Sequence, residues 1–94
     1  MINLEDLNKQ FEYEFQYWVP IFGSKPIEYI KHYDFSENYG VDTIHIFKLE
    51  NGKIAFVREV GHSGYSPEDA QIELFYCEQK ALEKFYRIKK NNID

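Results

Sequence analysis

The chain has 94 residues and a mass of 11.3 kDa, so we expect residues 1–94 to form a single small domain. Hydrophobic residues make up 44% and charged residues 29%, a balance that excludes the low hydrophobicity and high charge of disordered chains. The formal net charge of -5 disfavours direct binding to nucleic acid and to anionic membranes. We therefore expect a neutral or basic protein as the partner.

The sequence also indicates where in the cell the protein is located. The N-terminal residues lack the basic and apolar regions of a signal peptide, and no apolar run is long enough to span a membrane. Small secreted domains usually carry several cysteines, whereas Cys77 has no partner for an internal disulfide. Lysine, isoleucine, asparagine and tyrosine are frequent, as AT-rich coding tends to produce. We expect a location in the cytoplasm of a bacterial host cell.

An amphipathic helix is predicted at the start of the chain. Apolar residues recur at steps of three or four between positions 4 and 22, so they share one face of a helix. Asn3 is a suitable N-cap, and Pro20 disfavours the helical conformation of the residue before it. We expect this helix over residues 4–18.

Three strands are predicted next. Residues 27–35 alternate between apolar and polar side chains, which favours a strand, although their apolar positions also fit a short helix. Residues 43–49 and 53–60 are rich in β-branched and aromatic residues and flank the turn Asn51-Gly52. Asn-Gly is a strong hairpin signal because both residues tolerate a positive φ.

A second helix is predicted to start at Ser66, which would be its N-cap with Pro67 at the first helical position. Residues 67–78 are net acidic and residues 79–90 net basic, a gradient that the helix dipole favours. Cys77 falls on the apolar side of this helix as a packing residue. These elements predict an α+β fold of order α-β-β-β-α, a three-stranded antiparallel sheet with both helices on one face.

The histidines form no pattern typical of metal ligands. His32, His45 and His62 are not at metal-ligand spacing, and one cysteine cannot form a thiolate pair, so we expect no metal and no cofactor. His45 alternates with apolar neighbours in its strand. We expect it on the surface or as a hydrogen-bonded core residue.

Two features keep a small enzyme as an alternative. Glu78 falls within the apolar side of the second predicted helix, where a buried carboxylate would be a functional acid. The other interpretation is that Glu78 reaches solvent or pairs with a basic strand residue. His62 could serve as a general base toward Cys77 or Ser63. In the loop at 61–65, Tyr65 stands where a nucleophile elbow requires its second glycine. We therefore expect no enzymatic activity.

The outer face of the first predicted helix carries the clearest binding signal. Tyr13 and Tyr17 lie one turn apart, opposite the apolar face and among acidic residues. If the two predicted helix starts lie close together, their acids form one binding surface; otherwise the tyrosines cover a homodimer surface or lie in solvent. The predicted binding residues are tyrosines and acids, namely Glu5, Asp6, Glu12, Tyr13, Glu14, Tyr17, Tyr65, Glu68, Asp69 and Glu73.

The Asn51-Gly52 hairpin, the glycine-rich segment at 61–64 and Ser66 before a C-terminal helix resemble the double-stranded-RNA-binding domain. The resemblance implies that family's α-β-β-β-α fold over most of the chain. In that family lysines follow the serine and contact phosphates. Pro67 and Glu68 follow it here, so the resemblance favours a related interaction or dimerisation module without the basic residues.

A compact acidic domain rich in tyrosine, aspartate and glutamate is also similar in general type to small phage-encoded inhibitors of bacterial defence, including anti-CRISPR proteins. This resemblance implies carboxylates that occupy a basic groove of a nuclease where phosphates would bind, without a reaction. We therefore expect a non-enzymatic protein that inhibits or regulates a basic, nucleic-acid-handling partner by nucleic-acid mimicry or steric block. The interaction or dimerisation module and the small enzyme are the alternatives.

Overall fold

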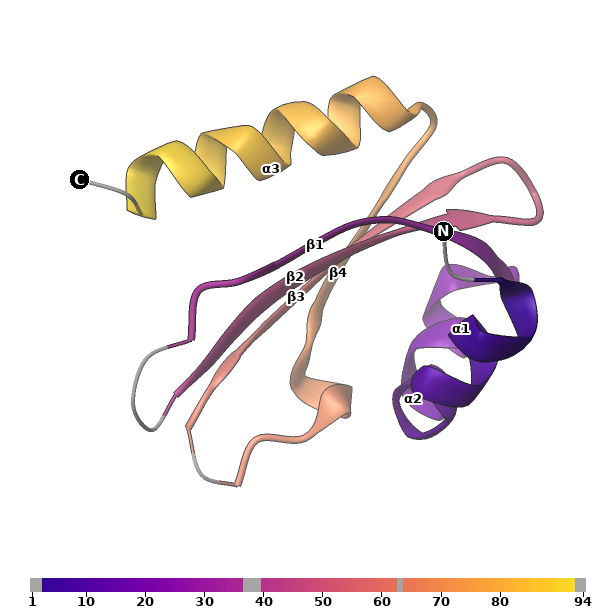
Figure 1. Ribbon diagram of the computed structural model, residues 1–94, viewed down its shortest axis with the longest axis horizontal. Coiled ribbons are helices and arrows are strands. Elements are labelled where there is room, and N and C mark those ends of the chain that lie inside the picture. The colour runs from indigo at the N-terminus through magenta and orange to yellow at the C-terminus, as the bar shows by residue number, and fades with distance from the viewer. Residues whose placement is uncertain (1–2, 37–39, 63, 93–94) are drawn as a thin grey trace.

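The fold is a four-stranded antiparallel sheet with helices on both of its faces (Figure 1). The computed structural model describes residues 3–36, 40–62 and 64–92. The strands follow the chain in the order β1-β2-β3-β4 across the sheet, and the predicted α+β class is confirmed. The elements are α1 (Leu4–Gln10), α2 (Glu12–Phe22), β1 (Pro26–Asp34), β2 (Val41–Leu49), β3 (Ile54–Gly61), the 3-10 helix η1 (Pro67–Asp69), β4 (Gln71–Phe75) and α3 (Glu78–Asn92).

The predicted helix over residues 4–18 is two helices, α1 and α2, which meet at Phe11. Phe11 has φ -109° and ψ 22°, so the helical geometry is interrupted there. The predicted end is wrong, because α2 continues through Pro20 to Phe22. Pro20 removes only one backbone donor, near the end of the helix, while the added turn buries Phe22. Gly23 then ends α2 with φ 69°, a conformation that favours glycine.

The first three strands follow the prediction. β1 spans Pro26–Asp34, so the strand is confirmed and the short helix is not formed. β2 and β3 form the predicted hairpin, in which Gly52 has φ 90° and its N–H donates to the carbonyl of Leu49 at 2.9 Å. Residues 37–39, between β1 and β2, and Ser63, in the loop at 61–65, lie outside the described residues.

The predicted start of the second helix is wrong. The segment that begins at Pro67 makes only one 3-10 turn, and the chain then forms β4, a fourth strand beside β3. In β4, Ile72 and Leu74 pack toward one core while Phe75 packs toward the other. This two-residue period suits a strand covered on both sides. Consequently α3 begins only at Glu78.

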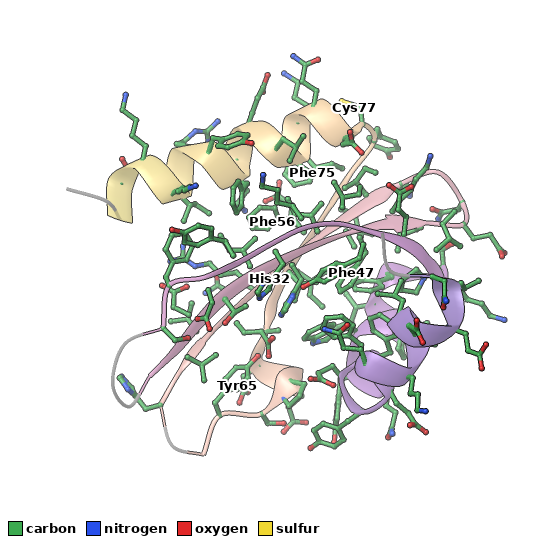
Figure 2. All side chains as sticks on the ribbon, in the orientation of Figure 1. His32, Phe47, Phe56, Tyr65, Phe75 and Cys77 are labelled. Atoms are coloured by element: carbon green, nitrogen blue, oxygen red, sulfur yellow. The ribbon has the colours of Figure 1, made fainter. Side chains whose placement is uncertain are left out.

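Strand residues alternate between two hydrophobic cores. On one face, Phe47 and Val57 pack under α1 and α2; on the other, Phe56 and Phe75 pack under α3 with Phe85. Figure 2 shows Phe47 on the side of α1 and α2 and both Phe56 and Phe75 toward α3. The predicted placement of both helices on one face is wrong. Because both faces of the central strands are apolar, each face needs its own helical cover.

Candidate functional site

A chain of hydrogen bonds lies on the sheet face that α1 and α2 cover. The Tyr29 hydroxyl lies 2.6 Å from Nδ1 of His45, and Nε2 of His45 lies 2.9 Å from Oε1 of Glu59. The Tyr65 hydroxyl donates to Oε2 of Glu59 at 2.7 Å. The side chains of His45 and Glu59 are only 8% and 12% exposed. No buried side-chain polar atom among the described residues lacks a hydrogen-bond partner, so this network is fully satisfied.

The direction of each hydrogen bond follows from the carboxylate. Glu59 accepts only, so Nε2 of His45 donates to it; in the tautomer that carries its proton on Nε2, Nδ1 accepts from the Tyr29 hydroxyl. Burial acts to raise the pKa of Glu59, but hydrogen bonds from His45 and Tyr65 outweigh it and hold that pKa below its ordinary value. Burial and the Glu59 carboxylate raise the pKa of both Tyr29 and Tyr65. The network thus keeps a charge on Glu59 and the protons on both tyrosines.

A carboxylate, a histidine and a hydroxyl in series are also the groups of a general-base relay. Here the raised pKa of Tyr29 makes its hydroxyl a poor nucleophile. The ring of His45 is enclosed by Phe11 and Trp18, at centroid distances of 5.1 and 5.7 Å. Three surface clefts are lined by other residues. These contacts favour a structural role, in which the network holds Tyr65 in place, over a general-base relay.

Tyr65 is held from a second side by Gly61. A Cβ atom at Gly61 would lie 2.8 Å from Cδ1 of Tyr65, so the tyrosine ring rests directly on the backbone there. The negative charges of Asp69 and Glu14 also contribute to the raised pKa of Tyr65, which places both acids near it. Tyr65 therefore joins the buried network to an acidic part of the surface.

Tyrosines and acids of α2 and η1 gather around Tyr65 and form what we call the tyrosine-acid surface. The rings of Tyr13 and Tyr17 pack edge to face, with centroids 5.5 Å apart. Hydrogen bonding with Tyr13 and the charge of Glu68 raise the pKa of Tyr17, which places Glu68 near α2. The surface consists of Tyr13, Glu14, Tyr17, Tyr65, Glu68 and Asp69.

One buried hydrogen bond holds η1 against α2. Nε1 of Trp18 donates to the carbonyl oxygen of Pro67 at 2.9 Å, across 49 positions of sequence. Trp18 is fully buried and Pro67 is buried as well. Because the indole N–H can only donate, Trp18 depends on this carbonyl for its hydrogen bond in the core.

Four of the predicted binding acids lie elsewhere. Glu5 and Asp6 belong to α1, which packs against β1, whereas η1 packs against α2. Glu12 lies about half a helical turn away from the flank of α2 that meets η1. Glu73 forms an ion pair with Lys84 of α3, on the opposite face of the sheet. Of the predicted binding acids, Glu14, Glu68 and Asp69 therefore belong to the tyrosine-acid surface, and these four do not.

The residues of the enzyme alternative do not converge. Glu78 is exposed at the start of α3, so it is not a buried carboxylate and the solvent-exposed alternative holds. Cys77 is exposed before α3, not packed within a helix (Figure 2). The antiparallel register pairs Ile54 with Phe75, which places Cys77 near the start of β3, while His62 follows the end of β3. His62 and Cys77 are therefore at opposite ends of that strand.

No three His, Cys, Asp or Glu side chains in residues 3–36, 40–62 and 64–92 are grouped to hold a metal ion. Within the same ranges, no helix is long and apolar enough to cross a membrane. Comparisons with protein families, with curated proteins and with solved structures find no match to this chain. The case for a function therefore rests on the geometry of the chain itself.

Sequence reasoning missed Tyr29 and Glu59 as members of a site. It left two outcomes for His45, and the hydrogen-bonded core residue is the one found. A signal for Glu59 exists in the pattern of β3: the acid follows Ala55 and Val57 at steps of two, so it faces the same core. An acid at such an inward position needs a partner, and His45 supplies it.

Replacing Glu59→Gln tests the electrostatics of the network. We expect the variant to be less stable than the wild type by about 1–3 kcal/mol at pH 7, because hydrogen bonds to a buried charge are lost. The pKa of folded Glu59 lies below its ordinary value of 4.5, so its contribution is complete above that pH and is lost as pH falls through the folded pKa. Urea unfolding of both proteins between pH 7 and pH 3 measures the difference. A gap that stays constant over this range would contradict the account.

Replacing Gly61→Ala tests the contact with Tyr65. The added methyl group meets the Tyr65 ring, so we expect a loss of about 1–3 kcal/mol in the free energy of unfolding. In a Tyr65→Ala background the same change is expected to cost less, because the ring atoms at 2.8 and 3.2 Å are gone and only the contact with the Cβ of residue 65 at 3.0 Å remains. Equal costs in both backgrounds, measured by urea unfolding, would show that the ring does not rest on Gly61.

Proposed function

We propose that this chain is a non-enzymatic binding protein that uses the tyrosine-acid surface to hold a basic, nucleic-acid-handling protein and to inhibit or regulate it. The observation that carries the proposal is the position of Glu68 and Asp69 near α2, with η1 fixed by the bond from Trp18 to Pro67. This bond holds the acids of η1 beside those of α2, although the two elements are distant in sequence.

The tyrosines of this surface suit contact with a protein. Tyr13 is 55% exposed and its ring packs against Tyr17, so it offers a large, ordered area to a partner. Tyrosine loses little conformational entropy on binding and is enriched among residues that dominate binding energy. Its ring face also attracts the cationic groups of lysine and arginine. A basic partner can therefore satisfy both the rings and the neighbouring carboxylates.

The surface is ordered before any partner arrives. Tyr65 is fixed by its hydrogen bond to Glu59 and by the backbone of Gly61, while η1 is fixed by Trp18. Side chains that are already in place do not have to be immobilised on binding, which lowers the entropic cost of association.

The charge favours a partner whose own ligand is a nucleic acid. A basic groove that holds phosphates also attracts carboxylates at similar spacing, here those of Glu14, Glu68 and Asp69. The net charge of -5 adds attraction over a longer range and speeds encounter with a basic protein. Small phage-encoded inhibitors of bacterial defence act in this way, and their place of action would be the cytoplasm of a bacterial host.

The proposal predicts that two sets of charge reversals with the same total change have different effects. The surface variant carries Glu14→Lys, Glu68→Lys and Asp69→Lys; the matched control carries Glu5→Lys, Asp6→Lys and Glu12→Lys. Each protein is immobilised and used to capture proteins from a nuclease-treated bacterial lysate, and the captured protein is then purified and its affinity measured. Because each contact charge contributes about 1 kcal/mol or more, we expect the surface variant to bind at least tenfold more weakly than the control.

The captured protein must also bind nucleic acid, and duplex DNA or RNA is expected to compete with this chain for it. Circular dichroism confirms that both variants fold. Equal loss of binding in both variants would show that only net charge matters. Retention of binding in both would show that the tyrosine-acid surface is not the site.

A further inference from the structure

The outer side of α3 is a second surface, on the sheet face opposite to the tyrosine-acid surface (Figure 1). The inner side of α3 is used by the core, where Ala81 and Phe85 are fully buried. Its outer side carries a shallow groove with an apolar centre and polar borders. The groove is lined by Glu78, Gln79, Leu82, Glu83 and Tyr86.

We propose that this groove binds a second copy of the same chain, with the two α3 helices packed antiparallel about a two-fold axis near the middle of the helix. A two-fold interface uses the same patch of both copies, so the patch must complement itself. The proposal goes beyond the binding function proposed above and does not depend on it.

One acid and one base on the outer side of α3 are complementary to those of an antiparallel copy. Glu83 lies in the first half of α3 and the exposed Arg87 in its second half, and the helix also carries the cations Lys80, Lys84, Lys89 and Lys90. Glu83 and Arg87 are four residues apart, so they share one flank of the groove. Antiparallel packing brings the same flanks together with their order reversed. Glu83 of each copy therefore meets Arg87 of the other.

Most of these charges have no strong partner within one copy. Among the described residues, Glu78, Arg87 and Lys90 form no ion pair. Glu83 contacts Lys80 at 3.6 Å and accepts a hydrogen bond from Gln79 at 3.3 Å; the side chains of Glu83 and Lys80 are 45% and 66% exposed, so their ion pair contributes little. The outer side of α3 thus has unused charge of both signs at positions that a second copy can neutralise.

The apolar centre of the groove is also suited to pairing. Leu82 and Tyr86 lie one turn apart, and Tyr86 is 51% exposed. The Tyr86 ring is held by an edge contact with Phe85 at 5.1 Å, and its hydroxyl accepts a hydrogen bond from Lys31 at 3.3 Å. A two-fold axis between these positions places Leu82 of each copy against Tyr86 of the other, which buries Tyr86 and the part of Leu82 that is not already packed against the core.

The size of the interface and the net charge set the conditions of association. A contact made by one helix from each copy belongs to the small interfaces, below about 1,200 Å², that are typical of transient complexes. The net charge of -5 makes two copies repel each other at long range. At about 0.1 M salt the Debye length is about 10 Å, shorter than the smallest molecular extent of 24 Å, so that repulsion is screened while contact pairs persist.

Sedimentation equilibrium of the full chain at pH 7 in about 0.1 M salt, at protein concentrations up to about 1 mM, tests this proposal. We expect the wild type to approach twice the 11.3 kDa monomer mass. Glu83→Lys and Arg87→Glu are each expected to weaken association at least tenfold, because each brings like charges together across the axis. The double variant Glu83→Arg/Arg87→Glu restores opposite charges and is expected to associate within a few-fold of the wild type.

Matched controls carry the same charge changes on exposed residues away from α3, at Glu50→Lys and Lys9→Glu, and are expected to associate as the wild type does. Circular dichroism and thermal melting confirm that every variant folds. A wild type that stays monomeric at about 1 mM overturns the proposal. Three other results also overturn it. They are a double variant that does not regain association, a matched control that loses association, and a tyrosine-acid surface variant that loses association.

The two proposals fail separately. A monomeric wild type that still captures its basic partner leaves the proposed function standing. If the chain dimerises but the surface variant captures the partner as well as its control does, the α3 proposal stands and the proposed function fails. The other outcome is a wild type that does not self-associate but binds duplex DNA. If Arg87→Glu abolishes that binding, the occupant is a nucleic acid and the second-copy proposal is overturned.

Discussion

The hydrogen bond from the Trp18 indole to the carbonyl of Pro67 fixes the place of Glu68 and Asp69, the two acids of η1. A buried indole N–H without an acceptor costs about 1–3 kcal/mol, so separation of η1 from α2 is disfavoured unless water replaces the carbonyl. While the bond is made, η1 stays on α2 and Glu68 and Asp69 stay beside the tyrosines. The bond therefore ties the acids of η1 to the tyrosines of α2.

The buried network supports the same arrangement from the sheet side. His45 is enclosed by aromatic rings, and its two ring nitrogens are satisfied by Tyr29 and Glu59, so a polar group is tolerated in the core of a small domain. Glu59 also accepts a hydrogen bond from the Tyr65 hydroxyl and thereby fixes this surface residue from the sheet. The high aromatic content, 18% of the chain, serves both tasks: it fills the core on each sheet face and supplies the exposed rings.

Local signals in the sequence were enough for the α+β class, for the hairpin at Asn51-Gly52 and for strand β1. They failed where distant contacts decide the outcome. Ser66 and Pro67 favour a helix start, but one turn satisfies that signal, and pairing with β3 then makes residues 71–75 a strand. The tyrosines of α2 were identifiable from helical spacing. The contacts of Glu59 were not, because its partner His45 lies 14 positions away on another strand.

Hydrogen exchange of the Trp18 indole N–H, followed by NMR, tests the central claim most directly, since the chain has a single tryptophan and hence a single indole signal. If η1 is held on α2 as described, the indole proton exchanges as slowly as the amides of the central strands, through global unfolding. Exchange much faster than that of the strand amides would mean that η1 leaves α2 while the sheet is folded. The tyrosine-acid surface would then not exist as one ordered unit.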